Sequence, residues 1–209
     1  MDFNSWLNTF TEKVPQKYRH FDNPISLIER KRDLLTNPEE ICRHSFYPLI
    51  KIQLRKNKLR KVPSLPSSNN SLKLKVKRDE PKIREILLCS HIDSLIYSYY
   101  AFLLSEEYET YKIIFPTFQI AYRKLNGKCN IEFSHEAIEH IKKNGCWILL
   151  FDFKDFFGSL KHLVLKEKIQ RLLNAERLSK DWFSIYKNIT KYSFIEQEII
   201  FEIKGIPEG

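Results

Sequence analysis

Asp152 is the residue of this chain whose type and position could do chemistry. It follows five apolar residues, Trp147 to Phe151, that run without a polar break. An apolar run of this length predicts a strand buried on both faces, and residues 155–173 then change to helical spacing. We therefore expect Asp152 at the carboxyl end of a buried strand, the edge at which layered α/β proteins bind ligands. Because a carboxylate is costly in an apolar neighbourhood, the pattern leaves two interpretations open, a metal ligand and a structural cap or ion pair.

The basic charge of the chain indicates a polyanionic partner. The 209 residues carry a net charge of +9, the balance expected of a protein that handles nucleic acid. Residues 51–61 hold six cations and no acid, with Ile52, Leu54 and Leu59 interleaved. This pattern favours an element that docks through its apolar residues and turns its cations outward. Contact with phosphates and a merely solvated face are equal alternatives for Arg55, Lys56, Lys58 and Arg60.

The elements around these residues follow from periodicity and capping signals. Alternation over Leu72–Lys77 predicts a strand, which Arg78–Pro81 turns into a second strand over Lys82–Leu88, giving a hairpin with one basic face. We read residues 63–71 as a loop. We expect residues 1–44 to be helical, with one helix starting at Asn37-Pro38. We further expect a helix over about 91–104 capped by Ser90 and a helix over about 135–144 capped by Ser134 and ended at Asn144-Gly145. A helix over about 179–191 and a last strand over 199–203 follow.

Composition argues against a membrane-spanning or disulfide-rich protein. A hydrophobic content of 43% supports a core, but no apolar run approaches the roughly 20 residues that span a bilayer. We see no signal peptide at the N-terminus. The four cysteines, Cys42, Cys89, Cys129 and Cys146, lack both CxxC pairs and zinc-site spacing. They are interpreted as buried free thiols, and the protein is expected in the cytoplasm without a membrane partner.

Four stretches, in this order, resemble the first half of a reverse transcriptase. The hairpin with Lys77, Arg78 and Arg84 resembles the opening fingers motif, and Ala121-Tyr-Arg123 resembles the second motif. Asp152-Phe-Lys-Asp-Phe-Phe157 resembles the palm motif that bears the first catalytic aspartate, and Gly205-Ile-Pro-Glu-Gly209 resembles the glycine-proline-glutamine-glycine motif. Residues 91–100 and 120–124 look like bacterial defence-associated reverse transcriptases of the abortive-infection kind. The resemblance covers roughly residues 44–209.

The resemblance implies roles for particular residues. Asp152 would bind two catalytic Mg²⁺ ions, with the backbone carbonyl of Phe153 as a further ligand. Arg84, with Lys77 or Arg78, would hold the dNTP triphosphate. Phe157 would lie under the sugar of the nucleotide as a steric gate against a 2′-hydroxyl; the alternative is that its ring packs on the sheet. Asp155 would be a structural residue or would lie on the triphosphate side of the site. Arg123 and Glu208 would contact template or primer, although Glu208 stands where the family usually has glutamine.

The fold implied by the resemblance is α+β, the fingers and partial palm of a right-hand polymerase with an N-terminal helical extension. Its parts would be residues 1–43 as the extension, 44–146 as the fingers-like region and 147–209 as a palm truncated before the second carboxylate motif. The implied function is RNA-directed DNA polymerase, in antiphage defence. Its partners would be an RNA template, a DNA or protein primer and dNTPs, with a partner subunit or oligomer left open. Two alternatives are a non-catalytic RNA-binding module derived from a polymerase and an unrelated helical nucleic-acid adaptor.

Overall fold

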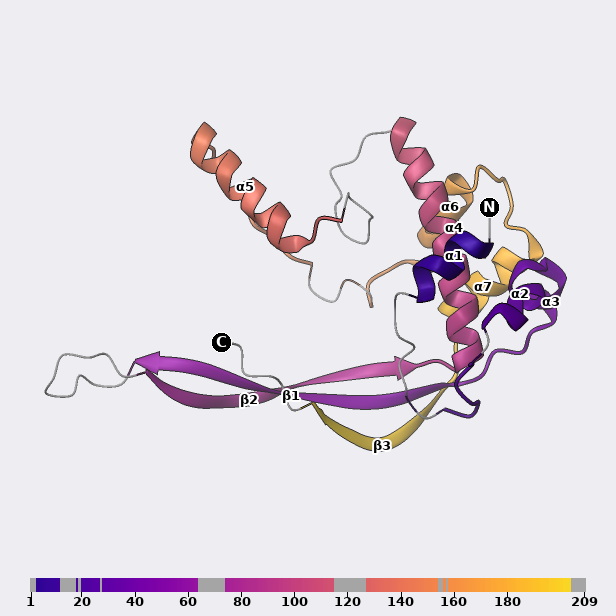
Figure 1. The fold of residues 1–209 in the computed structure, drawn as a ribbon, viewed down its shortest axis with the longest axis horizontal. Helices are drawn as coiled ribbons and strands as arrows, with labels where there is room; N and C mark the ends of the chain where they lie inside the picture. Colours follow the sequence, from indigo (N-terminus) through magenta and orange to yellow (C-terminus); the bar gives the residue numbers. More distant parts are fainter. Residues whose placement is uncertain are drawn as a thin grey trace, which may run out of the picture. The chain divides into compact units, whose positions relative to one another are not determined.

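The computed structural model describes residues 3–11, 18, 20–26, 28–63, 74–114, 127–153, 156 and 158–203, with backbone alone at 11, 61–63, 74–76, 112–114 and 197–203. These residues combine helices with one small sheet, so the predicted α+β class is confirmed. The chain divides into two compact units (Figure 1). The first unit is Met1–Tyr99 with Lys180–Gly209, and the second is Tyr100–Ser179.

The first unit contains a three-stranded sheet with the order β2-β1-β3. The strands are β1 (Leu49–Pro63), β2 (Leu74–Leu88) and β3 (Phe194–Ile203). β2 runs antiparallel to β1, whereas β3 runs parallel to it. The last strand that the sequence predicted is therefore confirmed, and it begins five residues earlier than the expected start at Ile199. Ile50 and Ile52 of β1 are buried and belong to the core of this unit.

The predicted hairpin is wrong in its position. The structure has no turn at Arg78–Pro81, and β2 runs through these residues to pair with β1 over almost its whole length. Pro81 lies at a register irregularity, because Lys56 faces Lys82 whereas Lys58 faces Asp79. Since β2 is at the edge of the described sheet, a proline without an N–H is tolerated there. Of the predicted loop at 63–71, Pro63 ends β1 and residues 64–71 lie outside the described part.

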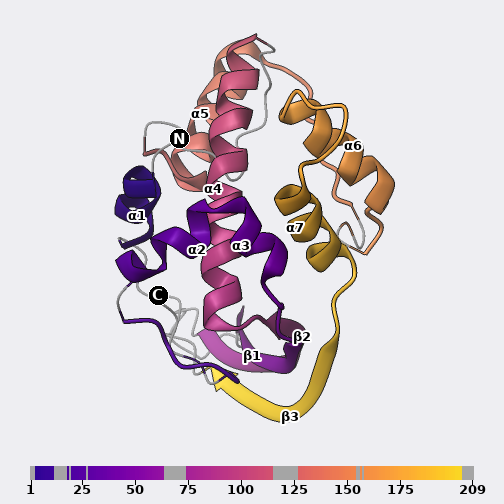
Figure 2. The same cartoon turned by 90° about the vertical axis from the view of Figure 1, so that its right-hand side faces the viewer.

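The helices of the first unit pack around the start of α4. They are α1 (Phe3–Thr11), η1 (Ile28–Lys31), α2 (Arg32–Thr36), α3 (Pro38–Arg43), the first turns of α4 (His91–Ile114) and α7 (Lys180–Thr190). The predicted helical N-terminus is therefore confirmed at 3–11 and over most of 28–43, whereas residues 20–26 form no helix, and the helix near 179–191 is confirmed. Trp6 of α1 is buried, donates its indole N–H to Ser98 Oγ at 3.2 Å, and meets the ring of Tyr99 edge-on, so α1 packs on α4 (Figure 2).

Capping signals placed two helix starts correctly. Asn37 accepts the N–H of Glu39 at 3.0 Å and Pro38 follows it, as expected for the start of α3. Ser90 Oγ accepts the N–H of Asp93 at 3.0 Å at the start of α4. α4 continues ten residues beyond the expected end near Leu104, because neither glycine nor proline interrupts the sequence before Pro116.

The second unit contains the rest of α4, α5 (Asn130–Asn144) and α6 (His162–Leu172). α5 ends as predicted, with Gly145 in the left-handed conformation at φ 57°. The predicted cap at Ser134 is wrong, since Ser134 lies inside the helix and its hydroxyl donates to the Asn130 carbonyl at 2.7 Å. Glu132 instead accepts the N–H of Cys129 at 2.8 Å at the helix start. The helix expected from residue 155 begins at His162.

The predicted buried strand before Asp152 is also wrong. Residues 146–153 form no regular element, and Trp147, Leu149 and Leu150 are exposed by 102%, 84% and 89%. A segment becomes a strand only by hydrogen bonding to a neighbouring strand, and the three described strands pair with one another instead.

The cysteines are free, as expected, but the prediction that they are buried is wrong. Cys42, Cys129 and Cys146 are exposed and Cys89 is half-buried. Within the described ranges, no helix is long and apolar enough to cross a membrane.

Candidate nucleic-acid interface

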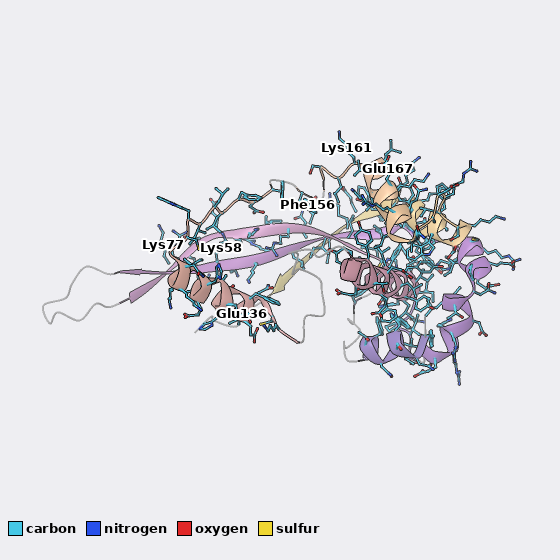
Figure 3. All side chains as sticks on the ribbon, turned by 90° about the horizontal axis from the view of Figure 1, so that it is seen from above. Lys58, Lys77, Glu136, Phe156, Lys161 and Glu167 are labelled. Carbon is cyan, nitrogen blue, oxygen red and sulfur yellow. The ribbon has the colours of Figure 1, made fainter. Side chains whose placement is uncertain are left out.

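The structure brings two predicted groups of cations onto one pair of strands. The predicted residues Arg55, Lys56, Lys58 and Arg60 lie on β1, and the predicted residues Lys77, Arg78 and Arg84 lie on β2. Lys82, to which the sequence analysis assigns no role, also lies on β2. We call residues 55–60 with 77–84 the outer ribbon. It carries eight cations against two carboxylates, Asp79 and Glu80. All eight cationic side chains are exposed, and Figure 3 shows Lys58 and Lys77 on the two strands. Residues expected to contact template and residues expected to contact nucleotide therefore lie on one two-stranded ribbon. By the strand register, Arg55 and Arg78 are on one of its faces and the other six cations are on the opposite face.

The register places cations of the outer ribbon directly opposite one another. Lys56 faces Lys82, and Arg60 faces Lys77. Directly opposed residues in an antiparallel pair have Cβ atoms about 4.5–5.5 Å apart, and like charges in this position are destabilising. Among the described residues, Arg60 is the one cation of the outer ribbon with an ion pair, at 3.3 Å to Asp79. The remaining positive charge is therefore available to an external anion.

The inner end of the same sheet is electrostatically balanced. Lys51 of β1 contacts Glu85 of β2 at 3.1 Å and Glu196 of β3 at 3.2 Å. Its hydrogen bonds, first to Glu85 and then to Glu196, raise the pKa of the Lys51 ammonium. One lysine thus links all three strands and supports their register. The contrast with the outer ribbon shows that the excess of cations begins at Arg55.

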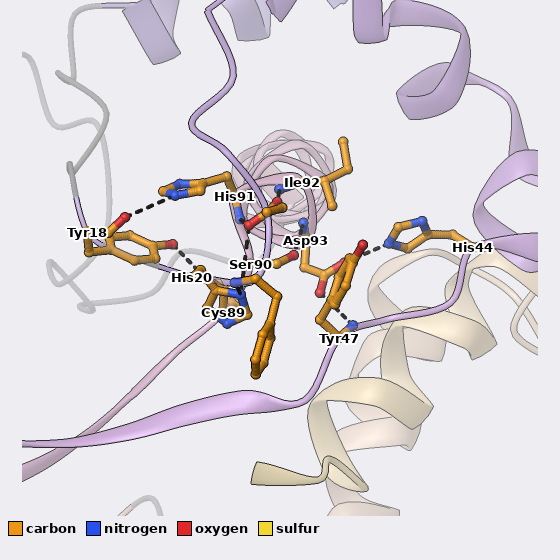
Figure 4. Close-up of polar contacts among 11 residues, drawn as sticks. Tyr18, His20, His44, Tyr47, Cys89, Ser90, His91, Ile92 and Asp93 are labelled. Atoms are coloured by element: carbon orange, nitrogen blue, oxygen red, sulfur yellow. Dashed lines mark hydrogen bonds and ion pairs between the residues drawn. The ribbon is translucent and has the colours of Figure 1, made fainter. Parts of the chain in front are cut away.

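A buried polar network attaches the start of β1 to the N-terminus of α4 (Figure 4). Asp93, exposed by 1%, lies 2.6 Å from His44 Nε2 and accepts the N–H of Tyr47 at 2.9 Å. Asp22 accepts the N–H groups of His91 and Ile92, both at 2.9 Å. Asp22 therefore satisfies two backbone donors that the start of α4 leaves unpaired, while Asp93 holds the backbone that leads into β1. The sequence indicated only the Ser90 cap, because Asp22 and His44 are far from α4 in the chain.

Tyr18 closes this network on one side. Its hydroxyl donates to the Cys89 carbonyl at 2.7 Å, and its ring stacks on His91. Burial, followed by the neighbouring Cys89, raises the pKa of Tyr18 to about 12. Burial also raises the pKa of the Cys89 thiol and of Tyr97. These groups therefore remain neutral at ordinary pH and act as a structural support for α4.

The predicted catalytic residue, Asp152, belongs to no group of three or more possible metal ligands in the described part of the chain. Asp152 is exposed, and its Oδ1 accepts the N–H of its own neighbour Phe153 at 2.9 Å. Among the described residues, no group of three or more His, Cys, Asp or Glu side chains could hold a metal ion. The described residues do not fit a two-metal site, so we derive no step through Mg²⁺.

Three further predicted residues cannot be placed. Arg123, Phe157 and Glu208, and with them Asp155, lie outside the described residues. Their assigned roles as template contact, steric gate and template-side carboxylate stay predictions. No protein-family model matches this chain, and no curated protein matches it in sequence. The outer ribbon is therefore the surface on which a functional proposal can be based.

Proposed function

We propose that the chain binds the sugar-phosphate backbone of a nucleic acid along the outer ribbon, as the fingers part of an RNA-directed DNA polymerase. The observation that carries the proposal is the gathering of eight exposed cations on β1 and β2, with like charges opposed at Lys56–Lys82 and Arg60–Lys77. A row of phosphates would neutralise both pairs. Sequence-independent contacts of this type supply most of the non-specific affinity of nucleic-acid-binding proteins.

The polymerase part of the proposal rests on the resemblance of the Asp152 motif and on the position of Arg84. Arg84 is exposed on β2 opposite Leu54, beyond the buried Ile52. A guanidinium in this position suits bidentate contact with a phosphate group. An RNA template, a DNA or protein primer, dNTPs and Mg²⁺ are the partners that this function requires, and antiphage defence is the process that the resemblance suggests.

The test is the salt dependence of binding to a labelled single-stranded RNA. Each neutralised phosphate contributes a slope of about 0.7 in a plot of log affinity against log salt. Replacing Arg55, Lys56, Lys58 and Arg60 with glutamine should lower the slope by up to about 2.8. The matched control replaces four exposed cations outside the outer ribbon, Lys161, Arg177, Lys187 and Lys191. Equal slopes for the two quadruple variants would show that the outer ribbon is only a solvated face.

A second candidate is a non-catalytic RNA-binding module that keeps the basic surface without the chemistry. Its support is the exposed position of Asp152, which belongs to no group of three or more metal-ligating side chains among the described residues. The test of the second candidate is incorporation of labelled dNTPs on an RNA template with Mg²⁺, a reaction that a module without the chemistry does not catalyse. We expect RNA binding without incorporation by residues 1–209, since Asp152 is the one carboxylate assigned to the metal. Incorporation by this chain would remove the second candidate.

A further inference from the structure

Three aromatic side chains are exposed near the inner end of the sheet. Phe21, Tyr47 and Phe194 are exposed by 56%, 43% and 48%, and we call them the aromatic platform. The rings of Phe21 and Tyr47 stack with centroids 6.4 Å apart and planes 22° apart. Leu49, two residues after Tyr47, donates its N–H to the Ser193 carbonyl at 2.9 Å and lies opposite Phe194. The three rings therefore come from neighbouring positions of the first unit.

The rings of Phe21 and Tyr47 are held in place from beneath. His20, whose side chain is completely buried, meets Phe21 edge-on at 5.0 Å and Tyr47 edge-on at 6.4 Å between centroids. The backbone of Tyr47 is fixed by Asp93, which accepts its N–H (Figure 4). Exposed rings on a fixed support lose little freedom on binding, and this preorganisation favours affinity.

Phe194 adds a cation to the platform. The ammonium of Lys51 lies 5.6 Å from the centroid of the Phe194 ring, a cation–π distance. The same ammonium is held by Glu85 and Glu196, so the position of Phe194 is tied to all three strands. Because these two carboxylates balance Lys51, the platform itself has no excess positive charge. It is suited to flat uncharged rings rather than to phosphates.

The outer ribbon indicates which ligand supplies such rings. β1 joins the two surfaces, and the six residue steps from Leu49 to Arg55 span about 20 Å in a strand. A ligand that follows β1 would therefore meet phosphate-binding cations at one end and exposed aromatic rings at the other. Single-stranded nucleic acid has both groups, since its bases are free to stack on aromatic side chains while its backbone follows cations.

We propose that the aromatic platform stacks bases of a single-stranded nucleic acid whose phosphates lie along the outer ribbon. The inference rests on the proposed function and assigns to it a base-stacking subsite. Every base has a flat π-face, so stacking of this kind tolerates any sequence. The subsite therefore selects unpaired bases over a duplex, whose bases are already stacked on one another.

The experiment compares two probes of equal length, a single-stranded oligonucleotide and its abasic counterpart, which keeps the phosphates and lacks the bases. The variants are Tyr47→Leu and Phe194→Leu, which remain apolar but lose the ring. Phe183→Leu is the control, since Phe183 is an exposed ring on α7. Each platform variant should bind the base-containing probe about tenfold more weakly, bind the abasic probe unchanged and keep the salt slope. The control should leave both affinities unchanged.

The outcomes separate this inference from the proposed function. Equal weakening of both probes by a platform variant, or of neither, would overturn the stacking subsite while leaving the outer ribbon in place. Absence of binding to both probes by the unaltered protein would overturn the proposed function together with the subsite. If Tyr47→Leu unfolds, Phe194→Leu alone still tests the subsite, because Phe194 takes no part in the hydrogen bonds of the network drawn in Figure 4. A melting curve identifies that case.

Discussion

The opposed lysines of the outer ribbon give the sharpest prediction, because removing them should affect binding and stability in opposite directions. Lys56 and Lys82 face each other across β1 and β2, and both are exposed. In the free protein their repulsion opposes the pairing of the strands by up to about 1 kcal/mol. In a complex, each ammonium can neutralise a phosphate. The double variant K56Q/K82Q should therefore be at least as stable as the parent and bind RNA more weakly.

The magnitude in binding follows from counterion release. Two lost phosphate contacts lower the salt slope by about 1.4 for a single strand. Between about 50 and 200 mM salt the parent should lose roughly sevenfold more affinity than the variant. The stability change should raise the Tm by no more than about 2–4 °C for a chain of this size. Fluorescence anisotropy at four salt concentrations measures the slope, and a thermal melt measures the Tm.

The control for this variant is K161Q/K187Q, which removes two exposed lysines outside the outer ribbon. It should leave the salt slope unchanged, apart from a small effect of net charge. A lower Tm of K56Q/K82Q with an unchanged slope would refute the reasoning. That result would mean that the lysine stems pack on the strands and that their ammonium groups contact no phosphate.

Three further predictions concern the polar network and Asp152. Asp93→Ala should lower the free energy of unfolding by about 3–5 kcal/mol, because it removes the partner of His44 and leaves the Tyr47 N–H without its acceptor. Urea unfolding measures this loss, and a change below about 1 kcal/mol would contradict the prediction. Folding raises the pKa of Tyr18 from about 10 to about 12, so the folded protein holds the phenol proton more tightly than the unfolded chain does. The resulting gain in folding free energy is fully present below about pH 10, and it is lost as the pH rises from about 10 toward 12. Tyr18→Phe should flatten this alkaline loss in denaturant titrations at pH 9 to 12, and an unchanged pH dependence would exclude Tyr18 as its source. Asp152→Asn should leave the Tm unchanged, because Asp152 is exposed and bonds only its neighbour's N–H among the described residues. A lowered Tm in a thermal melt would favour the structural interpretation of this carboxylate.

Features with short-range causes were predictable from the sequence. Asn37 and Ser90 cap helices through residues two and three positions away, and Gly145 ends α5 because its backbone adopts a left-handed conformation. Cations could also be named as candidate ligands from their types alone. Each of these features depends on a window of a few residues, which periodicity and capping rules cover.

Features with long-range causes were missed. Arg78–Pro81 has the residue types of a turn, and only the pairing of β2 with β1, which the sequence does not reveal, shows that the strand continues through it. The apolar run before Asp152 satisfies the pattern of a buried strand but pairs with no described strand. The cap that Asp22 places on α4 spans 69 residues of sequence. The joining of two cation groups into the outer ribbon likewise depended on strand register.

The parallel pairing of β3 with β1 has a consequence for synthesis of the chain. The two strands are separated by 145 residues at the Lys51–Glu196 contact, so one edge of β1 stays open after the β1–β2 hairpin has been made. At about 5–20 residues per second, the segment between Leu88 and Phe194 takes on the order of 5 to 20 s to translate. An open strand edge can pair with another chain during this interval, and lysine side chains on an edge oppose such pairing. The cations of the outer ribbon would thus protect the nascent hairpin from aggregation before any ligand reaches it.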